Sequence, residues 1–80
     1  MNKKTIFDSV QDIFRDIFDK DTLIISYKTS SEDIEHWDSL NHILLINAVQ
    51  EEFNIKISLE EMQLVNDVST LLDVIKKKIY

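Results

Sequence analysis

Serine, aspartate and histidine side chains gather in the middle of the chain, in the run Glu35-His36-Trp37-Asp38-Ser39-Leu40-Asn41-His42. Ser39 and His42 have the i, i+3 spacing that brings two side chains together on one face of a helix. With Asp38 they could form a nucleophilic site, but such a site also needs an oriented base and an oxyanion hole. No glycine builds a turn around the serine, and His42 falls on the predicted core face. We therefore expect no catalytic site and no enzyme activity.

The same run holds residue types that bind metals, namely Glu35, His36, Asp38 and His42. Their spacing matches no zinc pattern with a known mechanism. The chain contains no cysteine, which excludes thiolate ligands, disulfides and a cysteine nucleophile. We expect no metal site, with His36 a surface residue and His42 a partly buried packing residue.

Asp38 and Ser39 fit the start of a helix. Asp38 is a good N-cap residue, because its carboxylate can accept a free N–H group of the next turn. Ser39 then stands at the first helical position, where its hydroxyl can point to solvent. A phosphate on that hydroxyl would lie near the positive end of the helix dipole and near unsatisfied N–H groups. The pair is therefore either a simple cap or a point of attachment for an anionic group.

Length and composition describe one small acidic domain over residues 1–80, with a formal net charge of −6. Nucleic acids and anionic membranes bind proteins through clustered lysine and arginine side chains. The acidic net charge of this chain therefore argues against both as partners. No run is long enough to span a bilayer. The absence of cysteine fits a reducing compartment. We expect a cytoplasmic monomer that docks onto other proteins.

Apolar spacing predicts helices over residues 3 to about 19, 39–53 and 67–78, and a short helix that begins at a Ser58-x-x-Glu61 capping box. The absence of glycine and proline disfavours a β-rich fold. Residues 20–37 should form a long ordered loop pinned by apolar side chains, with four candidates: Leu23, Ile25, Ile34 and Trp37. The predicted fold is all-α, a small four-helix bundle of three main helices and one short helix with a long first loop.

The helix over residues 39–53 is apolar on two faces. An advance of about 100° per residue groups one set for the core: His42, Leu45, Ile46, Val49 and Phe53. Leu40, Ile43 and Leu44 fall on the opposite side, next to Asn47 and Glu51. A helix with two apolar faces is either central in its bundle or presents one face to a partner. In so small a bundle we expect some of this second face to be exposed.

Beyond this physical pattern, the run from Trp37 to Ile43 resembles the attachment site of acyl carrier proteins, whose signature is Asp-Ser-Leu. The similarity covers nearly the whole chain. It continues through Glu51-Glu52-Phe53, Ile55-Lys56-Ile57, Glu60-Glu61 and the Val68…Leu72…Ile75 helix. The triplet alone is weak, but with this downstream pattern the chain is identified as a member of that family.

The resemblance implies that Ser39 carries a covalent 4'-phosphopantetheine arm, added by a phosphopantetheinyl transferase that uses coenzyme A and magnesium. Asp38 would hold that magnesium in the transferase complex besides capping the helix. The thiol of the arm would hold acyl groups as thioesters for the enzymes that load and transfer them. The carrier itself would do no chemistry. The second helix would be the recognition helix, with the following docking residues: Leu40, Asn41, Ile43, Leu44, Asn47 and Glu51.

Several residues depart from the pattern of fatty acid carriers. Asn41, Leu44 and Gln50 stand where such carriers tend to have Asp or Glu, and Trp37 replaces a small residue. The departures favour a specialised biosynthetic pathway, of fatty acid or polyketide type, over housekeeping fatty acid synthesis. Two alternatives stay open: a carrier of aminoacyl or peptidyl groups, and an unmodified helical module for protein–protein interaction.

Overall fold

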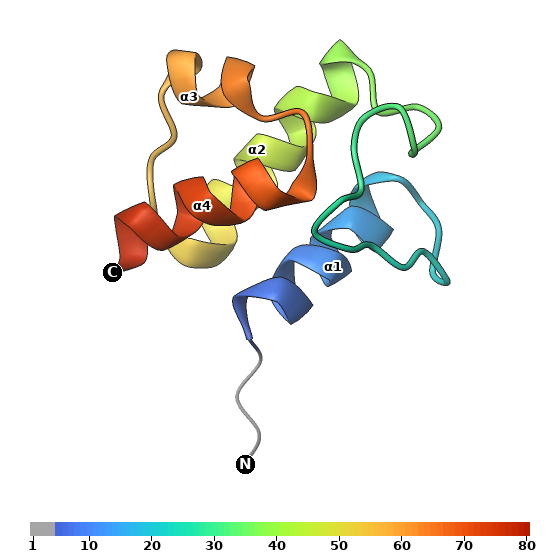
Figure 1. Cartoon of the computed structure of the whole chain (residues 1–80), viewed down its shortest axis with the longest axis horizontal. Helices are drawn as coiled ribbons and strands as arrows, with labels where there is room; N and C mark the ends of the chain where they lie inside the picture. Colours follow the sequence, from blue (N-terminus) through green and yellow to red (C-terminus); the bar gives the residue numbers. More distant parts are fainter. Residues whose placement is uncertain (1–4) are drawn as a thin grey trace.

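The computed structural model describes residues 5–80, which form four helices and no strand. The helices are α1 (Ile6–Ile17), α2 (Ser39–Phe53), α3 (Leu59–Leu64) and α4 (Val68–Ile79). Figure 1 shows α1, α2 and α4 as the body of the bundle, with short α3 at one end and the long first loop on the side of α1 and α2. The predicted all-α bundle of three main helices and one short helix is confirmed. Within residues 5–80, no helix combines the length and the apolar character needed to cross a membrane.

Helix α1 is shorter than the sequence predicts. It begins after Thr5, whose hydroxyl accepts a hydrogen bond from the Asp8 N–H at 3.0 Å. It ends at Ile17, and two residues later Asp19 adopts a left-handed backbone (φ 50°) that a helix cannot continue through. The predicted end near residue 19 is therefore wrong, while the predicted start at residue 3 lies outside the described residues.

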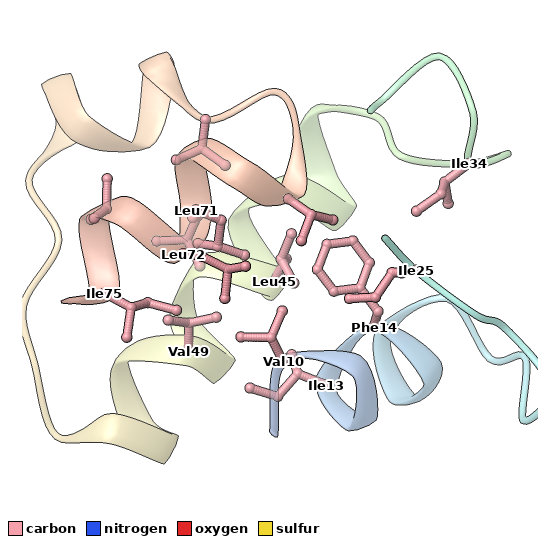
Figure 2. Packing of buried hydrophobic residues seen from close by; sticks show 14 residues of the cluster. Val10, Ile13, Phe14, Ile25, Ile34, Leu45, Val49, Leu71, Leu72 and Ile75 are labelled. Carbon is pink, nitrogen blue, oxygen red and sulfur yellow. The ribbon is translucent and has the colours of Figure 1, made fainter. Parts of the chain in front are cut away.

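The core lies between the three long helices (Figure 2). Its largest fully buried side chains are Phe14, Leu45, Leu71, Leu72, Ile75, Val10, Val49 and Val68. They come from α1, α2 and α4, and the two from α2, Leu45 and Val49, lie on its predicted core face. Ile79, the last residue of α4, is 41% exposed, because α4 ends there at the edge of the bundle (Figure 1).

Residues 20–37 form the predicted ordered loop, and the apolar side chains expected to pin it do so. Ile25 and Ile34 are buried, while Leu23 and Trp37 pack half-buried against the core. Two polar side chains of α1 add hydrogen bonds to the loop backbone. The Ile25 N–H donates to Gln11 Oε1 at 3.0 Å, and Arg15 Nε donates to the Leu23 carbonyl at 2.8 Å.

The loop also closes the start of α4. The first N–H groups of a helix have no partner within it, and here the loop supplies two. The Val68 N–H donates to the Thr29 carbonyl at 2.9 Å and the Ser69 N–H to the Tyr27 carbonyl at 3.2 Å. The loop is thus bonded both to the start of α4 and to the side of α1. Its last residue, Trp37, directly precedes Asp38, the N-cap of α2.

Three residues take the left-handed backbone that glycine would usually fill: Asp19, His36 and Asn54. The chain has no glycine, and aspartate, histidine and asparagine are the other types enriched in that region. Asn54 ends α2, and its N–H donates to the Gln50 carbonyl. His36 turns the chain immediately before the cap of α2. The turns of a glycine-free chain are built in this way.

The predicted capping box of α3 is present. Ser58 Oγ accepts from the Glu61 N–H at 3.1 Å, and Glu61 Oε1 accepts from the Ser58 N–H at 2.9 Å. Lys78 Nζ lies 3.0 Å from the same oxygen. The Ser58 N–H first, and then Lys78, hold the pKa of the Glu61 carboxyl below its ordinary value.

This lowered pKa predicts a pH-dependent contribution to stability. An ionised Glu61 stabilises the fold fully above the ordinary pKa of glutamate, and that contribution is lost as pH falls through the lowered folded value. Glu61→Gln keeps a cap acceptor but removes the charge. Denaturant unfolding from pH 7 to pH 3 should show wild type more stable than this variant at pH 7 and equal to it at the acid end. Glu60→Gln, in the same turn, is the control. A difference that stays constant with pH would contradict the assignment.

Candidate functional site

Asp38 and Ser39 stand where the sequence predicts. Asp38 has an extended backbone, and its Oδ1 accepts from the Asn41 N–H at 3.0 Å. Its carbonyl accepts from the His42 N–H at 2.8 Å, which is the first hydrogen bond of α2. Ser39 is the first helical residue and is exposed. The serine hydroxyl is therefore accessible at the positive end of a capped helix of fifteen residues.

Trp37 and His42 connect this helix start to α3. The indole Nε1 of Trp37 donates to His42 Nδ1 at 2.9 Å. The other ring nitrogen, His42 Nε2, lies 2.8 Å from the Met62 carbonyl oxygen. Both side chains are half-buried, and their rings stack at a centroid distance of 6.1 Å. The end of the first loop, α2 and α3 thus meet beside Ser39.

A shallow hollow of about 340 Å³ opens next to the serine. The residues that line it are Ser31, Trp37, Asp38, Ser39, His42, Gln63, Val65 and Asn66. Trp37, His42 and Val65 supply its apolar surface, and the other side chains are polar. Asp38 is the one charged residue among those lining the hollow.

The structure does not assemble a catalytic site from Ser39, His42 and Asp38. Both nitrogens of His42 are engaged by Trp37 and Met62, so neither is available to take a proton from the serine. Asp38 caps the helix and does not orient the histidine. Among residues 5–80, no three His, Cys, Asp or Glu side chains are grouped to hold a metal ion. Of the candidate ligands, His36 and Glu35 form only an exposed pair at 3.7 Å.

The second apolar face of α2 is exposed. Leu40, Ile43 and Leu44 are 67%, 45% and 44% exposed. Asn47 and Glu51 on the same side are also exposed. We call these five residues the outer stripe of α2. The sixth predicted docking residue, Asn41, is half-buried, and its Nδ2 donates to the His36 carbonyl at 2.8 Å, so its amide is already used to hold the turn before the helix.

Charge is unevenly distributed along α2. From Ser39 to Gln50 the sequence has no charged side chain other than a histidine. Acidic residues gather instead at the far end of the helix, where Glu52 shares a hollow with Asp12, Asp16 and Asp21. Glu52 is about 20 Å along the helix from Ser39 at a rise of 1.5 Å per residue. The exposed side of α2 from Leu40 to Gln50 therefore carries no acidic side chain, although Asp38 stands directly before the serine and the chain as a whole is acidic.

Sequence reasoning missed two polar anchors of α2. The sequence predicted Trp37 only as an apolar side chain that packs the loop against the core, and not as a hydrogen-bond donor to His42. Residue spacing also gave no reason to pair His42 with Met62, because Met62 lies in another helix. The indole N–H was the available signal, because a buried tryptophan usually finds a hydrogen-bond acceptor. It also missed that Gln50 Oε1 accepts from the Ile57 N–H at 2.7 Å. This bond fastens the connection to α3 onto α2.

Comparisons with known proteins identify the class. No protein-family model matches the chain. Among curated proteins, it is 31% identical over 71 residues to the acyl carrier protein of Lactococcus lactis subsp. cremoris, covering 89% of each chain. It is 44% identical over 43 residues to that of Buchnera aphidicola, covering 54% of this chain and 55% of the relative.

A solved structure has the same fold. The solution structure of a holo acyl carrier protein from Geobacter metallireducens matches with a TM-score of 0.84 and 38% identity, over 91% of this chain and 84% of that one. The fold is thus that of a small helical carrier protein. The chain belongs to the acyl carrier protein family.

Proposed function

We propose that Ser39 carries a covalent 4'-phosphopantetheine arm and that the chain shuttles acyl groups on it between enzymes. The observation that carries the proposal is the position of Ser39, exposed at the first residue of α2 and directly after the Asp38 cap. The holo state of the Geobacter metallireducens relative supports it. The residues present fit the group, since its phosphate would lie at the positive end of α2.

Ser39 is the group that reacts when the arm is attached. Its Oγ forms a bond to the pantetheine-side phosphorus of coenzyme A, and the bond from that phosphorus to the nucleotide oxygen breaks. The adenosine bisphosphate leaves with the electron pair, and the hydroxyl proton passes to a base of the transferase. Asp38, which is exposed beside the serine, would help to hold the magnesium ion that binds the diphosphate of coenzyme A in the transferase complex. Once attached, the arm supplies a thiol that holds acyl groups as thioesters.

Mass spectrometry tests the attachment directly. The full chain is incubated with coenzyme A, magnesium and a broad-specificity phosphopantetheinyl transferase. One arm per chain is the expected gain, because Ser39 is the single serine at the start of α2. A chain that stays unmodified with several transferases would leave the alternative, an unmodified interaction module.

We also propose the outer stripe of α2 as the surface that partner enzymes contact. The stripe begins at Leu40, next to the attachment serine, so the arm would lie at the active-site entrance of an enzyme bound to the stripe. Apolar contact would come from Leu40, Ile43 and Leu44. The first turns of α2 have no acidic side chain that could attract a basic patch on a partner enzyme. This chemistry supports a specialised biosynthetic pathway over housekeeping fatty acid synthesis. Assays with acyltransferases and with aminoacyl-activating synthetases would identify the cargo, and loading by a synthetase alone would make the chain an aminoacyl or peptidyl carrier.

The outer stripe has one charged residue, Glu51, at the end far from Ser39, and this low charge predicts a weak salt dependence of docking. Electrostatic steering can raise association rates by about 10- to 1,000-fold and is lost in high salt. Here we expect the association rate with the cognate loading enzyme to change by no more than about twofold between low and high salt, measured by stopped-flow fluorescence. Asn47→Asp adds one charge to the stripe and serves as the comparison. A steep fall in rate with salt, together with faster docking of Asn47→Asp, would show that the partner surface is basic.

A further inference from the structure

A second hollow, of about 490 Å³, opens between α1, the first loop and the last turn of α2. Its acidic side chains come from all three segments: Asp12 and Asp16 from α1, Asp21 from the loop and Glu52 from α2. We call this surface the acidic hollow. It shares no lining residue with the hollow beside Ser39, so it has no part in the function proposed above.

Three carboxylates of the acidic hollow lack a partner within the described chain. Among residues 5–80, the side chains of Asp16, Asp21 and Glu52 form neither an ion pair nor a hydrogen bond. Arg15 is the one cation of the described chain that lines the hollow, and its Nε already donates to the Leu23 carbonyl at 2.8 Å. These three carboxylates therefore outnumber the single guanidinium, and the hollow keeps a negative charge that attracts cations.

A buried hydroxyl belongs to the same hollow. Ser9 is only 9% exposed, and it lines the acidic hollow. Among residues 5–80, its hydroxyl forms no hydrogen bond with another residue. Over the same range, no fully buried side-chain nitrogen or oxygen lacks a partner, so the Ser9 oxygen is not sealed in the core but opens into the hollow. The protein thus leaves a hydrogen-bonding group unused at a place that only a small ligand group can reach.

The floor of the acidic hollow is apolar. Ile13, one turn along α1 from Ser9, is buried in the core cluster and also lines the hollow. An apolar floor with carboxylates around it suits a side chain with an aliphatic stem and a charged head, which can lay the stem on apolar surface while the head stays polar.

Charge and hydrogen-bonding capacity select the kind of cation. Among residues 5–80, no three His, Cys, Asp or Glu side chains converge as a metal ion requires. The oxygens of the hollow are spread over three segments, so a ligand with several donors pointing in different directions suits them better. A guanidinium has five N–H donors in a planar fork and no acceptor, whereas the ammonium group of lysine is a compact point charge.

We propose that the acidic hollow binds an arginine side chain of a partner protein. The guanidinium lies among the carboxylates of Asp16, Asp21 and Glu52 and donates to the Ser9 hydroxyl, with its stem against Ile13. Charge complementarity of this kind speeds association and discriminates between partners. The surface requires neither an arm on Ser39 nor docking on the outer stripe, so its failure and that of the proposed function are separate results.

Short peptides test the chemistry of the acidic hollow on the unmodified full chain. The ¹⁵N-labelled protein is titrated at low salt and neutral pH with a capped Gly-Arg-Gly peptide, and with peptides that have lysine or citrulline in place of arginine. Citrulline keeps the shape of arginine but has no charge. We expect the arginine peptide to shift the amide signals of Ser9, Asp16, Asp21 and Glu52 in a saturable way. The lysine peptide should bind more weakly, and the citrulline peptide should cause no shifts.

Two variants that lose the same single charge provide the matched control. Glu52→Gln changes the hollow and should weaken binding of the arginine peptide about threefold. Asp73→Asn changes an exposed residue of α4 that does not line the hollow, and it should leave the affinity unchanged. Ser9→Ala keeps the net charge and should also weaken binding, because the guanidinium loses an acceptor.

General attraction between a basic peptide and an acidic protein would give a different result. Shifts spread over acidic residues throughout the chain, an equal loss of affinity in Asp73→Asn and Glu52→Gln, or unchanged binding to Ser9→Ala would each overturn the proposal. A lysine or citrulline peptide that binds as tightly as the arginine peptide would do the same.

Discussion

Replacing Ser39 with alanine should abolish transfer of phosphopantetheine to the chain while leaving its fold intact. The hydroxyl oxygen is the atom that bonds to phosphorus, and alanine offers none. Ser39 is exposed at the first position of α2, where the Asp38 cap does the structural work, so the change in stability should stay within about 0.5 kcal/mol. Intact mass after incubation with coenzyme A, magnesium and a transferase gives the first result, and thermal unfolding gives the second.

Two further variants separate the chemistry from the helix start. Ser69→Ala removes another exposed serine, at the second position of α4, and should leave modification complete. Asp38→Asn keeps a good helix cap but removes a carboxylate. If Asp38 binds magnesium, this variant should be modified more slowly than wild type while its free energy of unfolding stays nearly unchanged. An arm found on the Ser39→Ala chain would place the attachment elsewhere and remove the basis of the proposed function.

The start of α2 could be predicted because its signals are local. Asp38 caps the next turn through its own side chain, and the Ser58–Glu61 box begins α3 in the same way. The two apolar faces of α2 follow from residue spacing, and the structure buries one and exposes the other. Such features need only the helix period and the chemistry of caps.

Contacts between distant segments could not be predicted in that way. The bond from His42 to Met62 joins α2 to α3, and the one from Gln50 to Ile57 holds the connection between those helices. Neither has a signature in spacing, because any half-buried polar side chain can find a backbone partner once the fold forms. The end of α1 was misjudged for a related reason. Its helical pattern runs on past Ile17, but Asp19 leaves the helical backbone as the loop turns.

Two neighbouring leucines on α2, Leu44 and Leu45, allow the effects of a mutation on docking and on folding to be measured separately. Leu45 is completely buried in the core (Figure 2), whereas Leu44 is 44% exposed on the outer stripe. Leu45→Ala should destabilise the fold by about 2–5 kcal/mol, a large part of the roughly 5–15 kcal/mol that holds such domains together. Leu44→Ala has less burial to lose and should cost roughly 1 kcal/mol or less. Denaturant unfolding of the two variants measures this difference.

Acyl loading by the partner enzyme should be affected in the opposite order, with the larger loss in Leu44→Ala and the smaller loss in Leu45→Ala. At a temperature where both are folded, Leu44→Ala should lower kcat/KM for acyl loading by about tenfold, equivalent to about 1.4 kcal/mol of lost contact. Ile43→Ala, one residue earlier on the stripe, should behave likewise. Leu45→Ala should load at close to the wild-type rate, because its side chain never reaches the surface. If Leu44→Ala loads at full rate, the stripe is not the docking surface; if it unfolds as readily as Leu45→Ala, the stripe belongs to the core.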